Sequence, residues 1–391
     1  MTSPVDTSVK WFTSKMLGAP VLRGQAGSLI AILDACLVNG WGVQVADTCA
    51  VASGICTMTF PLDHAAPVDA VVLVAGASIA ALNGEQKVTA VAPNVIQFAT
   101  AAADGTATGT ITAKMAPAGW NKPFTGTNLA VYKSADVAAN GHFVRVNDTN
   151  ALYARAVAYE TMTAISTGTG IVPTSTQLSG GQYWHKSAIA NAAPIDWYFA
   201  ADSRMFYFGC ASYQSNDIIG NAGGAYAAYV SGPFFGFGDP IPMCRAGDPF
   251  STLILGSGDS TNTYTGFSGF KVGYVGMSYM MRALSGTGTA VGVDCANTSG
   301  NQAEDPVCDA ASGSVRIAGV IARTTSTVSK RAMVPGVYTG ESQYMETVIP
   351  NLSAFKAGTP ERSYLAALSF EDMGAATGLK LLALDIAGPW R

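Results

Sequence analysis

The sequence of 391 residues is poor in charge, because Asp, Glu, Lys and Arg make up only 12% of it, about half the usual share of a globular domain. It has no run of 18 or more apolar residues, which argues against a membrane-spanning helix. The HExxH, GxGxxG, GxxxxGK[ST] and GxSxG patterns are also absent. The sequence therefore gives no support for a zinc protease, a nucleotide-binding enzyme or an α/β-hydrolase.

The basic residues are few and scattered. The net charge is −4 and the isoelectric point about 5.4, whereas a nucleic-acid groove needs a basic stripe. The N-terminus has no basic region followed by an apolar one, so we expect synthesis in the cytoplasm without a classical signal peptide. We predict no nucleic-acid partner, no membrane insertion, no cofactor, no metal site and no catalytic residue.

Seven cysteines occur without any CxxC pair, and the odd number argues against a secreted disulfide framework. Cys295 and Cys308 flank a polar loop and are the best candidates for a bridge. The alternative is two free thiols.

What the sequence does contain is one amphipathic helix pattern. Leu29, Ile30, Leu33 and Leu37 fall on one stripe of a 3.6-residue period, and Asn39-Gly40 supplies a stop. The pattern predicts a helix from about residue 26 to 38 that covers one face of a sheet.

Four apolar residues precede this helix near the N-terminus. Trp11, Phe12, Met16 and Leu17 come before a Gly-Ala-Pro break. Exposed aromatic residues at a terminus indicate a contact with a neighbouring subunit. A first strand that packs within the chain's own domain is the alternative.

The rest of the sequence is rich in short strands and turns. Five or so strands between about 45 and 115 suit a small antiparallel sandwich. The segments before and after it have the pattern of one continuous domain, which indicates that the sandwich is an insertion. We predict a mainly β, multi-domain antiparallel sandwich architecture. Its parts are an arm and helix over 1–44 that belong to the main body, an inserted sandwich over 45–116, and a main β body over 117–391.

Two sets of residues would suit glycan recognition or cleavage. Carboxylates near aromatic residues could cleave a glycan, although their turn positions favour structural roles. Aromatic residues of the 183–208 region could form a sugar platform or fill a core. The carboxylates are Asp196, Asp202, Asp239 and Asp248, and the aromatic residues are Tyr183, Trp184, Trp197, Tyr198, Phe199, Phe206, Tyr207 and Phe208.

The opening PVDTSVKWFTSKMLGAPVLRGQAGSLIAILDACLVNGWG resembles that of virion structural proteins of tailed bacteriophages and prophages. The likeness continues through LNGEQKVTAV, FATAAADGTATGTITAKMAPAGW, KPFTGTNLAVYKS, RAVAYETMTAISTGTG, YFAADSRMFYFG and FFGFGDPIPMCRAGDPF. It spans most of the first 250 residues, is looser in the C-terminal third, and carries no catalytic motif.

The resemblance implies a non-enzymatic component of the tail or baseplate region of a virion, assembled in the host cytoplasm. Its partners would be other copies of itself, other virion proteins and, as an open question, a host glycan or receptor. The alternatives are a capsid decoration protein, a glycan-binding or glycan-cleaving tail spike, and a bacterial surface adhesin. The missing signal peptide argues against the adhesin.

Overall fold

The computed structural model of the chain describes residues 3–211, 234–244, 247–258, 278–297, 317–325, 330–342, 349, 351–358, 361–370 and 379–391. Its strands pair antiparallel in sheets that curve into half-barrels. This confirms the prediction of a mainly β chain with an N-terminal helix. None of the helices in these residues is long and apolar enough to cross a membrane.

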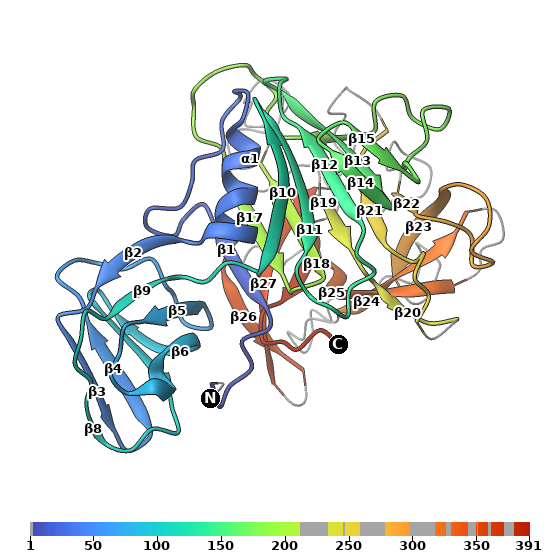
Figure 1. The fold of residues 1–391 in the computed structure, drawn as a ribbon. Coiled ribbons are helices and arrows are strands. Elements are labelled where there is room, and N and C mark those ends of the chain that lie inside the picture. Colours follow the sequence, from blue (N-terminus) through green and yellow to red (C-terminus); the bar gives the residue numbers. More distant parts are fainter. Residues whose placement is uncertain are drawn as a thin grey trace.

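Residues 41–115 form one eight-stranded sheet, which we call the small lobe (Figure 1). The strand order is β2-β9-β5-β6-β7-β4-β3-β8, with a 3₁₀ turn, η2 (Ala80–Leu82), before β6. The chain enters through β2 and leaves through its partner β9. The strands are β2 (Trp41–Val45), β3 (Thr48–Ala52), β4 (Ile55–Thr59), β5 (Val71–Ala75), β6 (Gly84–Ala92), β7 (Val95–Ala99), β8 (Gly105–Thr106) and β9 (Thr112–Met115).

The remaining strands form the body, in which one large sheet carries most of them. Its order is β1-β17-β18-β19-β21-β22-β23-β24-β25-β28-β27-β26, with β20 beside β25. The strands are β1 (Lys10–Thr13), β17 (Trp197–Ala201), β18 (Met205–Cys210), β19 (Phe234–Gly238), β20 (Ile241–Pro242), β21 (Leu253–Leu255), β22 (Ser278–Met280), β23 (Val291–Asn297), β24 (Ala318–Thr324), β25 (Lys330–Ser342), β26 (Ala354–Ala357), β27 (Arg362–Phe370) and β28 (Leu379–Asp385).

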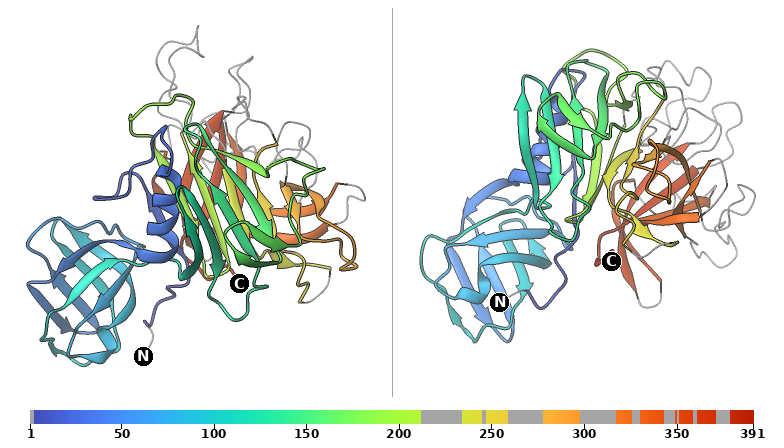
Figure 2. Two further views of the ribbon diagram at one scale, coloured as in Figure 1. Left: turned by 45° about the horizontal axis from the view of Figure 1, so that its top comes forward. Right: turned by 45° about the vertical axis from the view of Figure 1, so that its right-hand side comes forward.

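A second sheet of the body runs in the order β10-β11-β12-β13-β16. Its inner face packs against the large sheet, because the Trp184 ring lies 5.0 Å from that of Phe235 and 6.1 Å from that of Phe206. Figure 2 shows the two layers from two further sides. The strands are β10 (Trp120–Gly126), β11 (Leu129–Ser134), β12 (Phe143–Asn147), β13 (Tyr153–Tyr159) and β16 (Gln182–His185), with a separate hairpin of β14 (Thr161–Ala164) and β15 (Thr167–Thr169).

The predicted helix is present, with a change of type along its length. It is α-helical over α1 (Ser28–Leu33) and π-helical over η1 (Asp34–Asn39), and the predicted apolar stripe is buried. It ends at Gly40, whose φ of 67° places it where glycine is favoured. A Cβ at Gly40 would lie 2.1 Å from the carbonyl oxygen of Met115, so glycine lets the two crossing segments touch.

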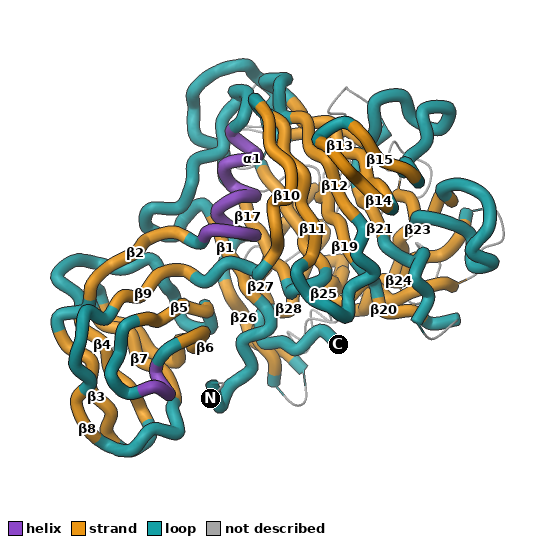
Figure 3. The backbone as a smooth tube through the Cα atoms, in the orientation of Figure 1, coloured by secondary structure: helices purple, strands orange, loops and turns teal. Residues whose placement is uncertain are grey.

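The N-terminal strand β1 ends the large sheet of the body, next to the small lobe (Figure 3). It pairs with β17 of the large sheet, while its side chains reach the small lobe. The Trp11 indole donates to the carbonyl of Asp69 at 3.1 Å, and Lys10 pairs with Glu85 at 2.8 Å. The segment is thus a core strand that links both parts of the chain, which is the second of the two sequence-based alternatives.

Candidate functional site

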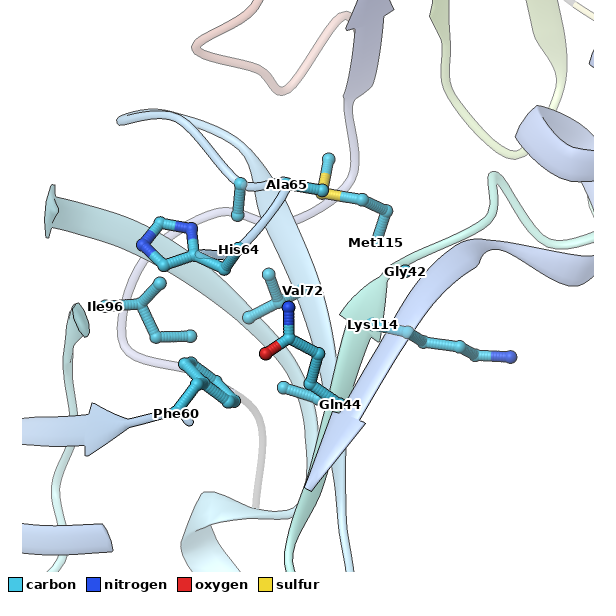
Figure 4. Close-up of a pocket in the computed structure, with 11 residues that line it drawn as sticks. Gly42, Gln44, Phe60, His64, Ala65, Val72, Ile96, Lys114 and Met115 are labelled. Carbon is cyan, nitrogen blue, oxygen red and sulfur yellow. The ribbon is translucent and has the colours of Figure 1, made fainter. Parts of the chain in front are cut away.

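A small pocket opens in the small lobe between β2, β9 and the loop after β4 (Figure 4). Its polar lining residues are Gln44, His64 and Lys114, and the Lys114 ammonium donates to the carbonyl of Asn39 at 2.6 Å. His64 Nε2 lies 2.9 and 3.0 Å from two carbonyl oxygens, those of Ala92 and Val95. Since carbonyls only accept, Nε2 carries the proton, and Nδ1 is an acceptor in the neutral ring.

The pocket presents two hydrogen-bond acceptors over an apolar floor. The buried His64 Nδ1 and Gln44 Oε1 have no partner among the residues that the structure describes, and the apolar lining includes Phe60, Val72 and Ile96. Its volume of about 20 Å³ suits a single water molecule. It is far below the several hundred Å³ that ligand pockets typically have, so we do not assign a substrate to it.

The aromatic residues of the 183–208 region are divided by the fold between core and surface. All except Tyr183 are fully buried, on one face or the other of the large sheet. Phe206, for example, stacks on Phe199 at 5.7 Å and meets Trp120 edge-on at 5.2 Å. Core packing is therefore the role of seven of the eight, and only Tyr183 remains available at the surface.

Tyr183 belongs to a half-buried group on the outer face of the five-stranded sheet, the arginine–tyrosine patch: Arg145, Tyr153, Arg155 and Tyr183. The Arg155 guanidinium lies 3.6 Å above the Tyr183 ring, and Tyr153 meets the same ring edge-on at 4.9 Å. In the described residues Arg145 has no ion pair, and its buried Nε has no partner. The patch thus offers arginine donors beside phenol rings.

The outward positions of these strands carry cations and no carboxylate. Lys133 of β11 faces outward with the two arginines, as the register with Phe143 and Tyr159 shows. The hairpin β14–β15 covers part of this face with Met162 and Ile165. The uncovered remainder is a positive surface suited to an anionic partner.

Each carboxylate considered for glycan cleavage is held by neighbours within the body. Asp196 pairs with Lys15 at 2.6 Å, and Asp202 pairs with Arg391 at 2.9 Å. Asp248 pairs with Arg331 at 3.0 Å, and Asp239 accepts a hydrogen bond from Thr252 at 2.6 Å. These bonds keep the four groups in structural roles, which agrees with the turn positions noted in the sequence.

The histidines lie apart from metal-binding groups. No cluster of three or more His, Cys, Asp or Glu residues occurs in the part of the chain that the structure describes. His142 Nδ1 lies 2.7 Å from the hydroxyl of Thr252, and burial lowers the pKa of its imidazole. His185 is buried beside Tyr183.

The residues predicted to contact a neighbouring subunit lie mostly inside the chain. Trp11, Phe12 and Met16 are buried, whereas Leu17 is 57% exposed. Of these four side chains, only that of Leu17 is exposed and accessible to another subunit. A subunit contact through this segment stays a prediction.

Another exposed apolar group, which the sequence analysis did not single out, lies on the small lobe. Val43 and Val45 of β2 are 63% and 50% exposed, and Leu62 is 70% exposed. Strand β2 ends the eight-stranded order, so no strand of the described chain pairs with its other side. We call Val43, Val45 and Leu62 the apolar edge. Unpaired edges with exposed apolar residues invite another chain. The alternation of Val43, Gln44 and Val45 could have indicated a strand, but the fold decides whether its valines are buried.

The predicted Cys295–Cys308 bridge cannot be placed, since Cys308 lies outside the described residues. The sequence also predicts exposed polar loops over 256–265 and 286–313, and their residues 259–265 and 298–313 lie outside the described residues.

Comparison of the chain with models of known protein families found no match, and comparison with curated proteins found none either.

Proposed function

We propose that the chain is a non-enzymatic structural component of a tailed-phage virion, most consistent with the tail or baseplate region, that assembles through protein contacts. The observation that carries the proposal is the apolar edge: exposed valines on a strand whose second side is unpaired in the described chain. A low charge fraction of 12% and the resemblance of the first 250 residues to virion proteins support it.

The proposal includes the finer architecture expected from the sequence. In it, 1–44 and 117–391 form one main body, 45–116 is an inserted domain, and the sheets of each are arranged as sandwiches. The partners are further copies of this chain and other virion proteins.

Immunogold labelling of purified particles, with antibody against the recombinant protein, tests the location. Gold at the tail end supports the proposal. Gold over the head favours the capsid decoration alternative instead. Particles that carry no label, and no protein detectable in an immunoblot, contradict a virion role.

The apolar edge gives a sharper test. Val43→Lys with Val45→Lys places two charges on the unpaired strand, and edge lysines oppose pairing with another chain. We expect incorporation into particles to fall at least tenfold, by quantitative immunoblot of purified virions. The free energy of unfolding should change by no more than about 0.5 kcal/mol, because both valine side chains are exposed.

The matched control is Val137→Lys, since Val137 is an exposed valine as well but lies in the body. It should be incorporated as the parent is. Normal incorporation of the double variant would remove the apolar edge from the assembly contacts.

A second candidate function is glycan binding, which the arginine–tyrosine patch favours. Arginine forks bind carboxylates in pairs of hydrogen bonds, and tyrosine rings pack on sugars. An acidic polysaccharide would fit this positive face.

Arg145→Ala should weaken retention on an immobilised acidic polysaccharide about tenfold. Lys356→Ala should not, because Lys356 lies on a different sheet, with its side chain 63% exposed. Equal retention of both variants speaks against this function.

A further inference from the structure

Two cysteines of the small lobe lie against each other across a hairpin. Cys49 of β3 and Cys56 of β4 have their sulfur atoms 3.5 Å apart. In the register of the two strands Cys49 is opposite Met58 and Cys56 is opposite Val51, so both thiols are on the inward face. The sequence alone gave no reason to pair these two among seven cysteines.

The pair is buried but close to an edge of the sheet. The two residues are 1% and 0% exposed. On its other side, β3 pairs with β8 over only two residues, Ala50 with Thr106 and Val51 with Gly105. Local opening of such a short pairing gives small molecules access to the sulfurs at a fraction of the cost of unfolding the lobe.

One hydrogen bond joins the two sulfurs, and either thiol can be its donor. When Cys56 donates, the bond lowers the pKa of Cys49 and raises that of Cys56. In that arrangement Cys49 loses its proton more readily than Cys56, and the thiolate is the nucleophile in disulfide exchange.

We propose that Cys49 and Cys56 form a redox-active dithiol that closes to an intramolecular disulfide with a small disulfide oxidant such as oxidised glutathione. The two sulfurs need to approach by only about 1.5 Å to reach the bond length of about 2.0 Å. This inference does not rest on the proposed function.

The reaction balances in two steps. The Cys49 thiolate attacks one sulfur of oxidised glutathione, and a glutathione thiolate leaves and takes up a proton. The Cys56 thiol then loses its proton and attacks the Cys49 sulfur of the mixed disulfide, which releases the second glutathione. The protein loses two protons and two electrons, and one oxidised glutathione becomes two reduced molecules.

The test uses the full chain and a protease that cleaves before aspartate. Cleavage at Asp47 and Asp63 gives the peptide 47–62, which contains both cysteines and no other. The protein is incubated with oxidised glutathione, denatured, alkylated and digested. We expect most of the peptide to be unalkylated at both positions and lighter than the reduced peptide by two hydrogen atoms, with full reversal by dithiothreitol.

Internal and variant controls make the result specific. Cys36, which is buried and has no cysteine neighbour in the described residues, should remain alkylated in the same sample. In Cys49→Ala, Cys56 should be alkylated or carry one glutathione. A parent peptide alkylated at both positions, or carrying two glutathiones, overturns the proposal.

Discussion

Replacing Asp148 with alanine is expected to destabilise the fold by about 3–5 kcal/mol, the range for breaking a buried ion pair. Asp148 and Lys186 form an ion pair in which both side chains are 0% exposed. The second carboxylate oxygen accepts hydrogen bonds from the backbone N–H groups of Leu29 and Ile30, at 2.9 and 3.2 Å. The substitution thus leaves the buried Lys186 ammonium without its counter-ion and the N–H groups in the first turn of α1 without their acceptor.

The matched control for this prediction is Lys15→Ala. It removes an ion pair with Asp196 whose side chains are 63% and 38% exposed, so its cost should not exceed about 1 kcal/mol. Denaturant unfolding followed by tryptophan fluorescence compares the two. Equal midpoints would show that the Asp148 contact contributes little.

The pKa shifts of Asp148 and Lys186 show why removing one charge of the ion pair should destabilise the fold more than removing both. Burial raises the pKa of Asp148 and lowers that of Lys186, so the folded chain favours the neutral form of each. The raised carboxyl pKa gives stability that is present at low pH and is lost as pH rises through the folded pKa. The lowered lysine pKa gives stability that is present above its unfolded value, about 10.4, and is lost as pH falls through the folded pKa.

At neutral pH both groups therefore bear a desolvation cost that their attraction offsets. Asp148→Asn together with Lys186→Met removes both charges and keeps an oxygen near the helix start. The double variant should be less destabilised than Asp148→Ala, and its stability should depend less on pH between 3 and 6 than that of the parent.

Phe206→Ala should cost about 3–5 kcal/mol as well, the range for deleting a buried aromatic ring. Phe206 is fully buried and touches rings of both sheets, with Trp184 at 6.1 Å and Phe199 at 5.7 Å. The substitution would leave a cavity where a ring of the large sheet packs on Trp120 and Trp184 of the second sheet. Thermal and denaturant unfolding both report the loss.

Phe206→Leu is the control for cavity size, because it keeps most of the apolar volume. Its cost should be well below that of alanine, since the site stays filled. If leucine and alanine are equally destabilising, ring-to-ring contacts rather than volume hold the two sheets together.

The sequence by itself determined much of the secondary structure. The 3.6-residue stripe of Leu29, Ile30, Leu33 and Leu37 fixed the helix, because only one helix face could be buried. Short apolar runs in the sequence predict strands over 253–255 and 380–386, and the structure has β21 and β28 close to these bounds. Seven of the eight aromatic residues fill the core, which was one of the two sequence-based alternatives.

Only the tertiary structure decided which distant residues meet. Asp148 and Lys186 are 38 positions apart, and neither lies in a recognisable motif. Cys49 and Cys56 became a pair through strand register, which a sequence of seven cysteines leaves open. The sequence left open whether Trp11 contacts a neighbouring subunit or belongs to a strand of its own domain. The structure buries Trp11, because β1 pairs with β17, almost 190 residues away. Local patterns record which face of an element avoids water, whereas the choice of partner for that face depends on how the whole chain closes around it.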